Sequence, residues 1–499
     1  MIVTGTSRFA AGGSMHWVVI QTGGTQRYLF DSNKRKLNVG ASYLVTKLPE
    51  WVSEAIGEIE GVTEENIVVN VSGVANLLVD DEETGRAIVA AVTRRALDEA
   101  PGLQVWGCVG PAISGALGPA LRETYDLAEL IRSTTPGSVE RFPATPFTAR
   151  SPLDSLPVTE QRKLAADDSI ALSKVAAEKW DSASVGLATI KEKVTDSSSA
   201  IMKVDNDDDH ETWTSIVHID GNGFGQLLIQ LTDEESDDFE VRLKDLSNAL
   251  EAIGWEALNT AIDHLHRSDD KPWILPLVVG GDDLTAIVSA PRARAFALAY
   301  LKAFEDKTRA KEIVSDAAQG VLGRPYLTAA AGIAIVKPTH PFHTAYRRAE
   351  ELCRSAKNAK TTAPESSALD IQVFHESVGR SLDDVRSDLQ GSEDPLTQLW
   401  PGELLTSHTG VGGLGSAARL DEVVSELRQG VLTSSEWHGL RTALTDRDAD
   451  AWRRSVEGLK AQLAVFDPGR LKSAAALLDD ETIPYLLPAM DLLDVEDAR

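Results

Sequence analysis

A short turn, Gly280-Gly281-Asp282-Asp283, lies between two runs of residues that favour β-strands. The run from Trp273 to Val279 leads into the turn, and the run from Leu284 to Val288 leads out of it, which predicts a β-hairpin. The two glycines permit a sharp turn and the close approach of a ligand. Asp282 and Asp283 are then expected at the tip, where water or a cation can satisfy their charge.

A third carboxylate ends another strand-like run, Trp213 to Asp220, which gives way to Gly221-Asn222-Gly223-Phe224-Gly225. If the two strands are neighbours, Asp220 faces Asp282 and Asp283 at one edge of a sheet. Three carboxylates would repel one another there unless a cation lay between them. Hard oxygen ligands suit Mg²⁺ or Mn²⁺, and such sites commonly hold the metal together with substrate phosphates. This pattern predicts a nucleotide site.

A simpler reading is that the turn is only an acidic hairpin tip, because Gly and Asp are the commonest turn residues. The wider pattern favours the nucleotide site. A further predicted strand (Pro325 to Lys337) follows the hairpin, and an amphipathic helix ending at Ser355-Ala356-Lys357 follows that strand. We expect Lys357 to offer a point charge to phosphates, with a solvated lysine at a helix end as the alternative. His218 is expected to be packed rather than catalytic.

The composition limits the partners. The 499 residues include 49 Lys and Arg against 76 Asp and Glu, a net charge of -27. This balance disfavours direct capture of nucleic acid, which depends on basic residues that displace counterions. It leaves open a small nucleotide or a partner protein that holds the nucleic acid. The two cysteines, Cys108 and Cys353, provide neither a disulfide framework nor a zinc site. With no signal peptide or membrane-spanning run, we expect a cytoplasmic protein without membrane association.

The fold class predicted is α+β, with two ferredoxin-like palm domains of the nucleotidyl cyclase and polymerase type, a helical linker and a C-terminal helical bundle. The first copy lacks an acidic pair at its hairpin turn, Ser72-Gly73-Val74, so it is not expected to bind metal. Its predicted elements are a strand 16–20, a helix 40–59, strands 66–71 and 75–79, a helix 84–99 and a strand 103–109. The predicted domains are 1–110 (first palm), 111–211 (helical and loop linker), 212–380 (second palm, with the GGDD motif) and 381–499 (helical).

Four smaller patterns complete the organisation. Residues 160–193 are predicted to be helical, and 369–375 to form an edge strand. The acidic run 205–211 is interpreted as a solvated linker rather than a calcium site, because it lacks the glycine and closing glutamate of an EF-hand. Residues 410–415 match GxGxxG, but no strand precedes them, so a dinucleotide site is not expected.

The second palm, residues 212–380, resembles a known family. The segment Ile219 to Gly225, the turn at 280–283, Ala331-Gly332-Ile333-Ala334-Ile335 and the helix from Ala349 to Lys357 are similar to the catalytic palm of the large polymerase-like subunit of type III CRISPR effector complexes. That subunit makes cyclic oligoadenylates in antiviral defence. The segments 28–34 and 40–44 resemble the other palm of that family.

The resemblance implies a nucleotidyltransferase that makes cyclic oligonucleotides, with cyclic oligoadenylate the expected product, from ATP. Asp220, Asp282 and Asp283 would be catalytic and would hold two Mg²⁺ or Mn²⁺ ions. The backbone of Asn222, Gly223, Phe224 and Gly225 would cradle phosphates, with Gly280, Gly281 and Lys357 also binding the nucleotide. Ser72 and Gly73 of the first palm would help to bind the acceptor nucleotide.

Three features depart from the family pattern. The sequence contains no His-Asp dipeptide, so the nuclease domain found in many members, and its DNase activity, are not expected. The segment 141–147 has no cysteines where the family has a zinc-binding insert. Asn222 occupies a position where the family often has a second acid, although its side chain can still offer an oxygen.

Several alternatives stay open. The protein could be a non-catalytic nucleotide-binding scaffold subunit of a CRISPR-type complex, or an enzyme like a diguanylate cyclase. Against the cyclase, Leu284 follows Asp283 directly, where that family has an acid and a phenylalanine after GGD. The expected partners are ATP, together with CRISPR effector subunits carrying guide RNA and target RNA or a second copy of the chain. The sequence leaves undecided whether the protein acts alone or within a complex.

Overall fold

The computed structural model describes most of the chain. The described residues are 14–136, 141–143, 145–165, 168–194, 196–204, 212–233, 236, 238–375, 381–389, 401–406, 414–445, 449–479 and 481–497. The acidic run 205–211 and most of the GxGxxG match lie outside them.

Contacts divide the chain into two compact units whose segments alternate along the sequence. The first unit comprises Met1–Lys193, Phe224–Ala252 and Lys311–Gly323, and the second comprises Val194–Gly223, Ile253–Ala310 and Arg324–Arg499. The predicted boundaries at 110, 211 and 380 follow sequence order instead, and they remain our proposal for the evolutionary domains.

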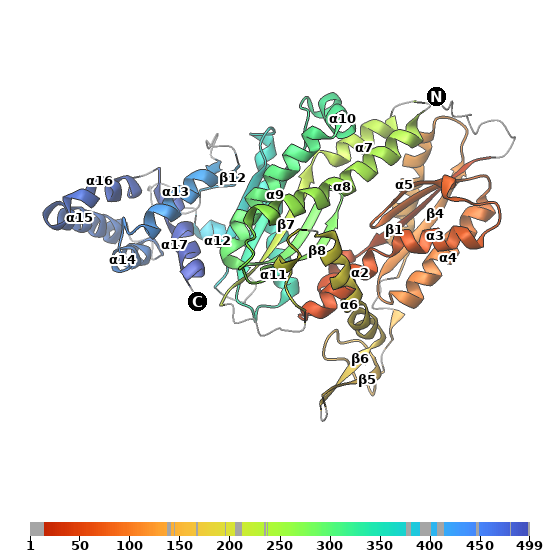
Figure 1. The fold of residues 1–499 in the computed structure, drawn as a ribbon, viewed down its shortest axis with the longest axis horizontal. Coiled ribbons are helices and arrows are strands. Elements are labelled where there is room, and N and C mark those ends of the chain that lie inside the picture. The colour runs from red at the N-terminus through yellow and green to blue at the C-terminus, as the bar shows by residue number, and fades with distance from the viewer. Residues whose placement is uncertain are drawn as a thin grey trace. The chain divides into compact units, whose positions relative to one another are not determined.

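The first unit is built on a four-stranded antiparallel sheet in the order β2-β3-β1-β4. Strands β1 and β4 of this sheet are labelled in Figure 1. Its strands are β1 (His16–Gly23), β2 (Ile67–Val71), β3 (Val74–Val79) and β4 (Gln104–Ala112), and a separate hairpin is formed by β5 (Val158–Ala165) and β6 (Asp168–Ser173). Its helices are α1 (Thr25–Phe30), α2 (Arg35–Val45), α3 (Leu48–Glu58), α4 (Glu82–Glu99), α5 (Leu117–Thr134), α6 (Lys174–Lys193), α7 (Phe224–Asp233), the first part of α8 (Phe239–Leu265) and α10 (Glu312–Leu322).

Helices α4 and α5 cover opposite faces of the first sheet. Gly85 of α4 lies against Val18 and Val109, whereas Gly110, the next residue along β4, lies against Thr124 of α5. Because side chains alternate between the faces of a strand, neighbouring residues meet different helices. Helix α3, which precedes β2, packs against α4, which follows β3, as in the ferredoxin-like β-α-β-β-α-β plan predicted for the first copy. Helix α5 follows β4 and is an addition to that plan.

Helices α2 and α6 cross closely because Gly40 has no side chain. A Cβ atom on Gly40 would lie 1.7 Å from the carbonyl oxygen of Lys179. The Lys179 side chain, 1% exposed, donates hydrogen bonds to the Tyr28 carbonyl oxygen at 2.6 Å and to the two carboxylate oxygens of Asp31 at 2.8 and 2.9 Å. A buried charge needs such a partner, so this ion pair ties α6 to the segment after α1.

Two predictions in this unit were wrong. The single helix predicted over 40–59 is two helices, because Pro49 lacks the N–H that would continue α2 and instead lies in the first turn of α3. The start of the helix predicted over 160–193 is the β5–β6 hairpin. Residues 160–163 are good helix formers, but the pairing of Val158 with Ser173 and of Gln161 with Ala171 overrides that preference. The rest of the predicted helix is α6.

The second unit contains a seven-stranded sheet in the order β13-β12-β11-β10-β7-β9-β8. Its strands are β7 (Thr214–Asn222), β8 (Ile274–Gly280), β9 (Asp283–Ser289), β10 (Thr328–Val336), β11 (Ala368–Val373), β12 (Leu404–Leu405) and β13 (Gly415–Ser416). Its helices are the second part of α8, α9 (Ala290–Ala310), α11 (Phe342–Asn358), α12 (Leu382–Leu389), α13 (Ala417–Arg428), α14 (Ser434–Thr445), α15 (Ala449–Phe466), α16 (Pro468–Leu477) and α17 (Ile483–Asp497).

The two sheets share one plan. The order β8-β9-β7-β10 in the second unit repeats β2-β3-β1-β4 in the first, strand for strand in chain order. This correspondence supports the predicted duplication of a palm. The strand predicted at 369–375 is not at an edge, because two short strands, β12 and β13, extend the sheet beyond β11.

Helix α11 lies directly on the sheet at Gly332 of β10. A Cβ atom on Gly332 would lie 2.0 Å from the carbonyl oxygen of Ala349 and 2.3 Å from the backbone nitrogen of Cys353. The imidazole of His218, the register partner of Gly332 on β7, meets the ring of Tyr346 on the same helix. The face of the sheet that carries His218 is therefore the face that α11 covers.

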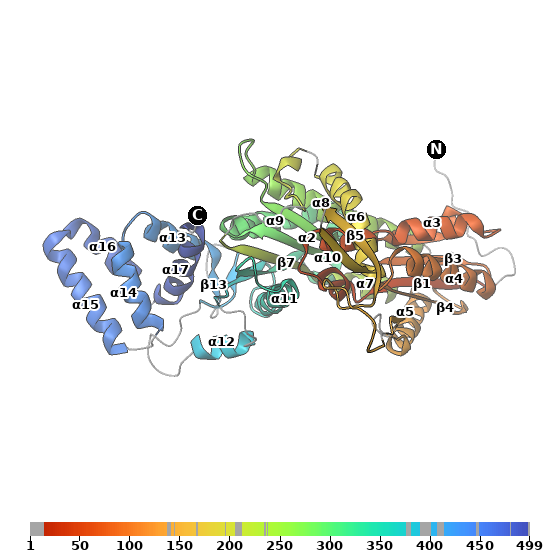
Figure 2. The same ribbon diagram turned by 90° about the horizontal axis from the view of Figure 1, so that it is seen from below.

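The C-terminal helices α13 to α17 gather at the end of the chain coloured blue (Figure 2). They are attached to the palm through α9, where the Arg294 guanidinium lies 3.0 Å from Asp421 of α13. None of the helices in the described part of the chain has both the length and the hydropathy needed to cross a membrane.

Candidate functional site

Asp220, Asp282 and Asp283 come together at one end of the second sheet. Asp220 on β7 is the direct register partner of Asp283 on β9, and Gly280 on β8 pairs with Asp283 from the other side. The backbone N–H of Gly221 donates a 3.1 Å hydrogen bond to the Asp282 carbonyl oxygen. Gly281 has φ of 59°, a left-handed conformation that glycine adopts without strain. The GGDD residues thus close the predicted hairpin beside β7.

The three carboxylates are divided between two sides of the sheet. Asp220 and Asp283 are opposed across the ladder and lie on the α11 face. The Asp282 side chain lies over Gly221, where an added Cβ atom would be 2.5 Å from the Asp282 Cβ and 3.0 Å from its Oδ2. Any larger residue at position 221 would displace Asp282.

The local environment opposes ionisation of the hairpin acids. Burial, followed by repulsion from Asp220, raises the pKa of Asp282 from 3.8 to about 6. Loss of hydration and repulsion from Asp282 and Asp220 raise the pKa of Asp283 to about 7. Part of the Asp283 side chain is open to solvent, so water screens some of this effect. A positive charge at this position would relieve the repulsion.

Lys357 supplies one such charge. It lies in the last turn of α11 and forms an ion pair with Asp220, in which both side chains are about one-third exposed. Lys357 therefore lies beside the acids, where it was predicted, but it contacts Asp220. Its binding of phosphates remains a proposal.

His218 is packed into the sheet. Its Nδ1 atom lies 3.0 Å from the Thr285 hydroxyl, and burial lowers the pKa of the imidazole to about 4. The side chain is 6% exposed and neutral at physiological pH. This agrees with the packing role predicted for it.

Strand β7 ends at Asn222, two residues after Asp220, and this asparagine is 6% exposed. Its side-chain nitrogen donates a 3.3 Å hydrogen bond to the Thr328 hydroxyl of β10, and its Oδ1 has no hydrogen-bond partner among the described residues. Gly223 has φ of 98° and ends the strand sharply. Phe224 and Gly225 open α7, which belongs to the first unit.

Ser72 and Gly73 lie in the first unit, in the turn between β2 and β3. Gly73 has φ of 92°, and its carbonyl oxygen accepts a 2.9 Å hydrogen bond from the Thr22 N–H. The turn is thus fixed to β1. Its part in binding an acceptor nucleotide remains a proposal.

Sequence reasoning missed Tyr300 of α9. This tyrosine is fully buried, its hydroxyl has no hydrogen-bond partner among the described residues, and burial raises its pKa, with further contributions from the charges of Asp282 and Asp283. Nothing in the local sequence distinguishes it from a core aromatic residue at helical spacing. It was also not possible to foresee that Thr328 would bond Asn222, because this contact spans 106 residues.

Asp220, Asp282 and Asp283 provide the ligand atoms of a divalent-ion site, but their side chains are not arranged around a common point. Carboxylate oxygens are hard ligands that suit Mg²⁺ or Mn²⁺. A nearby cation would favour the ionised forms of Asp282 and Asp283, whose pKa values are raised first by burial and then by neighbouring carboxylates. Within the described ranges, however, no group of three or more His, Cys, Asp or Glu side chains is arranged to hold a metal. The donor types therefore suit a divalent ion, whereas the positions of the described side chains do not form its coordination shell.

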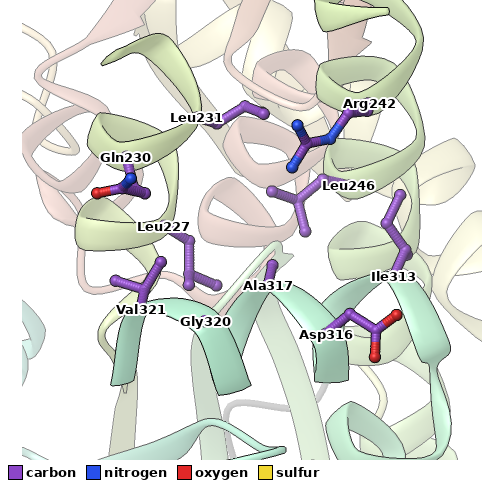
Figure 3. A pocket seen from close by; sticks show the side chains of 10 residues that line it. All are labelled: Leu227, Gln230, Leu231, Arg242, Leu246, Ile313, Asp316, Ala317, Gly320 and Val321. Carbon is purple, nitrogen blue, oxygen red and sulfur yellow. The ribbon is translucent and has the colours of Figure 1, made fainter. Parts of the chain in front are cut away.

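A pocket of about 440 Å³ lies in the first unit, between α7, α8 and α10 (Figure 3). Its walls are largely aliphatic, with the charged groups of Arg242 and Asp316 and the amide of Gln230 among them. None of the residues predicted for the site lines it.

A sheet with a hairpin of this kind, repeated in a second copy without the acids, defines a two-palm protein of the polymerase and nucleotidyl cyclase class. The family model described as Cas10/Cmr2, second palm domain, matches residues 213–363. Residues 213–363 are therefore similar to the Cas10/Cmr2 second palm domain, which confirms the predicted resemblance to the polymerase-like subunit of type III CRISPR complexes.

Solved structures of Csm1 share the fold over nearly the whole chain. A Csm1–Csm4 cassette in complex with cA4 matches with a TM-score of 0.52 and 11% identity, covering 97% of this chain and 70% of the other. Csm1 in T. onnurineus matches with 0.52, 12% identity and coverage of 97% and 70%. A Csm1–Csm4 cassette in complex with pppApApA matches with 0.55, 11% identity and coverage of 98% and 71%. At these identities the likeness is one of fold. No curated protein matches the sequence.

Proposed function

We propose that the protein is a nucleotidyltransferase that makes cyclic oligonucleotides, cyclic oligoadenylate in particular, from ATP as an antiviral second messenger. The observation that carries this proposal is the meeting of Asp220, Asp282 and Asp283 at one end of the second palm sheet. The fold likeness to Csm1–Csm4 cassettes in complex with cA4 and with pppApApA supports adenylate chemistry.

Asp220, Asp282 and Asp283 would hold two divalent ions, which when bound acidify the attacking 3′-hydroxyl and stabilise charge at the α-phosphate and the pyrophosphate. The residues of the chain prepare this site. Gly280 and Gly281 let the hairpin close tightly, so that substrate can approach the backbone.

The loop after Asp220 would bind phosphate through its backbone N–H groups, at Asn222, Gly223, Phe224 and Gly225. Lys357 would exchange its contact with Asp220 for contacts with substrate phosphates. Ser72 and Gly73 would belong to the acceptor pocket. Because the similar structures include Csm1–Csm4 cassettes, we propose that this chain also assembles with CRISPR effector subunits carrying guide and target RNA.

The test is nucleotide turnover by the full chain, alone and after reconstitution with its effector subunits and target RNA. With ATP and Mn²⁺, the wild-type protein should release pyrophosphate and form 3′–5′ linked products. Asp282→Ala combined with Asp283→Ala should reduce both signals by at least about 10³-fold, because the site loses two of its three proposed ligands. Asp450→Ala, which removes an exposed acid on α15, is the matched control and should retain full activity.

Other outcomes identify the alternatives. Metal-dependent ATP binding without turnover, in both the isolated and the assembled protein, would support the non-catalytic scaffold and overturn the enzyme. That alternative has some support from the Asp220–Lys357 ion pair, which occupies a proposed metal ligand. Preferential use of GTP in competition with ATP would support a cyclase of the diguanylate type.

A further inference from the structure

A second group of charged and aromatic side chains lies at the same end of the second sheet. Arg324 and Tyr326 immediately precede β10, and Thr328 opens it. Thr328 is the register partner of Asn222, and Ala330 is the partner of Asp220. Side chains two residues apart on a strand share a face, so Thr328 and Asn222 lie on the Asp220 face, about 7 Å along the strand from Asp220.

Arg324 is connected to this position by direct contacts. One guanidinium nitrogen donates a 3.4 Å hydrogen bond to the Thr328 hydroxyl, which also receives the Asn222 amide at 3.3 Å. The guanidinium lies 5.9 Å from the centre of the Tyr326 ring. The guanidinium of Arg309, from the end of α9, lies 4.2 Å from the same ring, and the Tyr326 hydroxyl donates a 2.9 Å hydrogen bond to the Glu365 carbonyl oxygen. The hydrogen bond holds the Tyr326 side chain in place, and both guanidiniums lie near its ring.

The two arginines differ in how their charge is compensated. Arg309 forms a 3.1 Å ion pair with Asp306. Arg324 has no carboxylate partner among the described residues, and its buried Nε has no hydrogen-bond acceptor there. A half-buried guanidinium that retains free donors is unusual, because charged groups away from water are normally paired. Arg324 therefore has donors available for an anion.

We propose that Arg324, oriented by Tyr326 and Thr328, binds the polyphosphate tail of a nucleoside triphosphate, a proposal that rests on the function proposed above. Three carboxylates gather at this end of the sheet, and Lys357 already contacts one of them. A triphosphate entering the site brings further negative charge and requires a cation without an acidic partner. The planar guanidinium matches phosphate oxygens through paired N–H groups, which a lysine ammonium does not provide.

The experiment measures binding of ATP, AMP and inorganic tripolyphosphate to the full chain by calorimetry in the presence of Mg²⁺. Arg324→Ala should weaken ATP binding about 10- to 100-fold, the range expected for hydrogen bonds to a charged group. AMP binding should change by less than about twofold. Tripolyphosphate should compete with ATP on the wild-type protein and lose that ability in the variant. Arg324→Lys should fall between the two.

The matched control is Arg354→Ala, which removes the same charge from an exposed position on α11 where the side chain forms a 3.6 Å ion pair with Glu350, one helical turn away. It should bind ATP like the wild-type protein. Unchanged ATP affinity in Arg324→Ala, or equal losses for ATP and AMP, would overturn this inference and leave the proposed function standing. If the wild-type protein binds no ATP, the proposed function fails and this inference fails with it.

Discussion

Asp220, Asp282 and Asp283 bring three carboxylates to one end of the second sheet, two on one side and one on the other. Lys357 contacts Asp220 alone, and the pKa values of Asp282 and Asp283 rise to about 6 and about 7. A protein that needed this end of the sheet only for stability would gain from neutral side chains there. The cost is consistent with a site prepared for a cation that arrives with substrate.

The raised pKa values predict how stability depends on pH. Both groups bind protons more tightly in the folded chain than at the ordinary value of 3.8, so the stability they contribute is complete below about pH 4 and is lost as the pH rises through 6 and 7. In a chelator, Asp282→Asn combined with Asp283→Asn should therefore raise Tm more at pH 8 than at pH 5. After allowance for screening at Asp283, about 1 kcal/mol is expected, or about 1–2 °C for a chain of 499 residues.

The same Tm measurement can be repeated with a divalent metal ion present. Adding Mn²⁺ at pH 8 should raise the Tm of the wild-type protein, because a ligand that binds only the folded state stabilises it. The double variant should not respond. Parallel pH profiles for the two proteins, or an equal response to Mn²⁺, would contradict the electrostatic account of the site.

At the scale of the element, the position of Lys357 depends on how closely α11 lies on β10. Gly332→Ala would put a Cβ atom 2.0 Å from a backbone oxygen of α11, so the helix would have to move. Overpacking of this kind costs about 1–3 kcal/mol. We expect a lower Tm and weaker ATP binding, since the displaced helix carries Lys357.

Gly458→Ala is the control for this substitution. Gly458 lies within α15, and nothing lies within 4 Å of an added Cβ atom. Alanine there should stabilise the helix by about 0.5–1 kcal/mol. If both variants behaved alike, close packing at Gly332 would not be what holds the helix in position.

The elements around the site could be predicted because their signals are local. Strand-forming runs broken by glycines located β7, β8 and β9, and the amphipathic spacing before Lys357 located α11. The β5–β6 hairpin could not be predicted in this way, since its polar residues form strands only through pairing with each other. The contacts of Thr328 and Arg324 were also out of reach, because they depend on the register of β7 against β10.

At the scale of the whole molecule, the two palms have the same strand order but different turns. The GGDD turn connects β8 to β9 in the second unit, and Ser72-Gly73 connects β2 to β3 in the first. Of these two turns, only the GGDD turn between β8 and β9 carries acids. A duplicated fold with one acidic copy is consistent with one copy holding the reacting nucleotide and the other accepting its neighbour, which is the division of roles we propose.

The net charge of -27 gives a final prediction about RNA. Non-specific binding of nucleic acid depends on basic residues that release counterions, and it gives Kd values of about 10⁻⁴–10⁻⁶ M at physiological salt. The isolated full chain should bind an unrelated single-stranded RNA more weakly than about 10⁻⁴ M, with little dependence on salt, as measured by fluorescence anisotropy. Micromolar binding that weakens steeply with salt would instead reveal a basic surface that the total charge conceals. A weak result would support the proposal that partner subunits hold the target RNA, and turnover should then depend on their presence even when all three acids are intact.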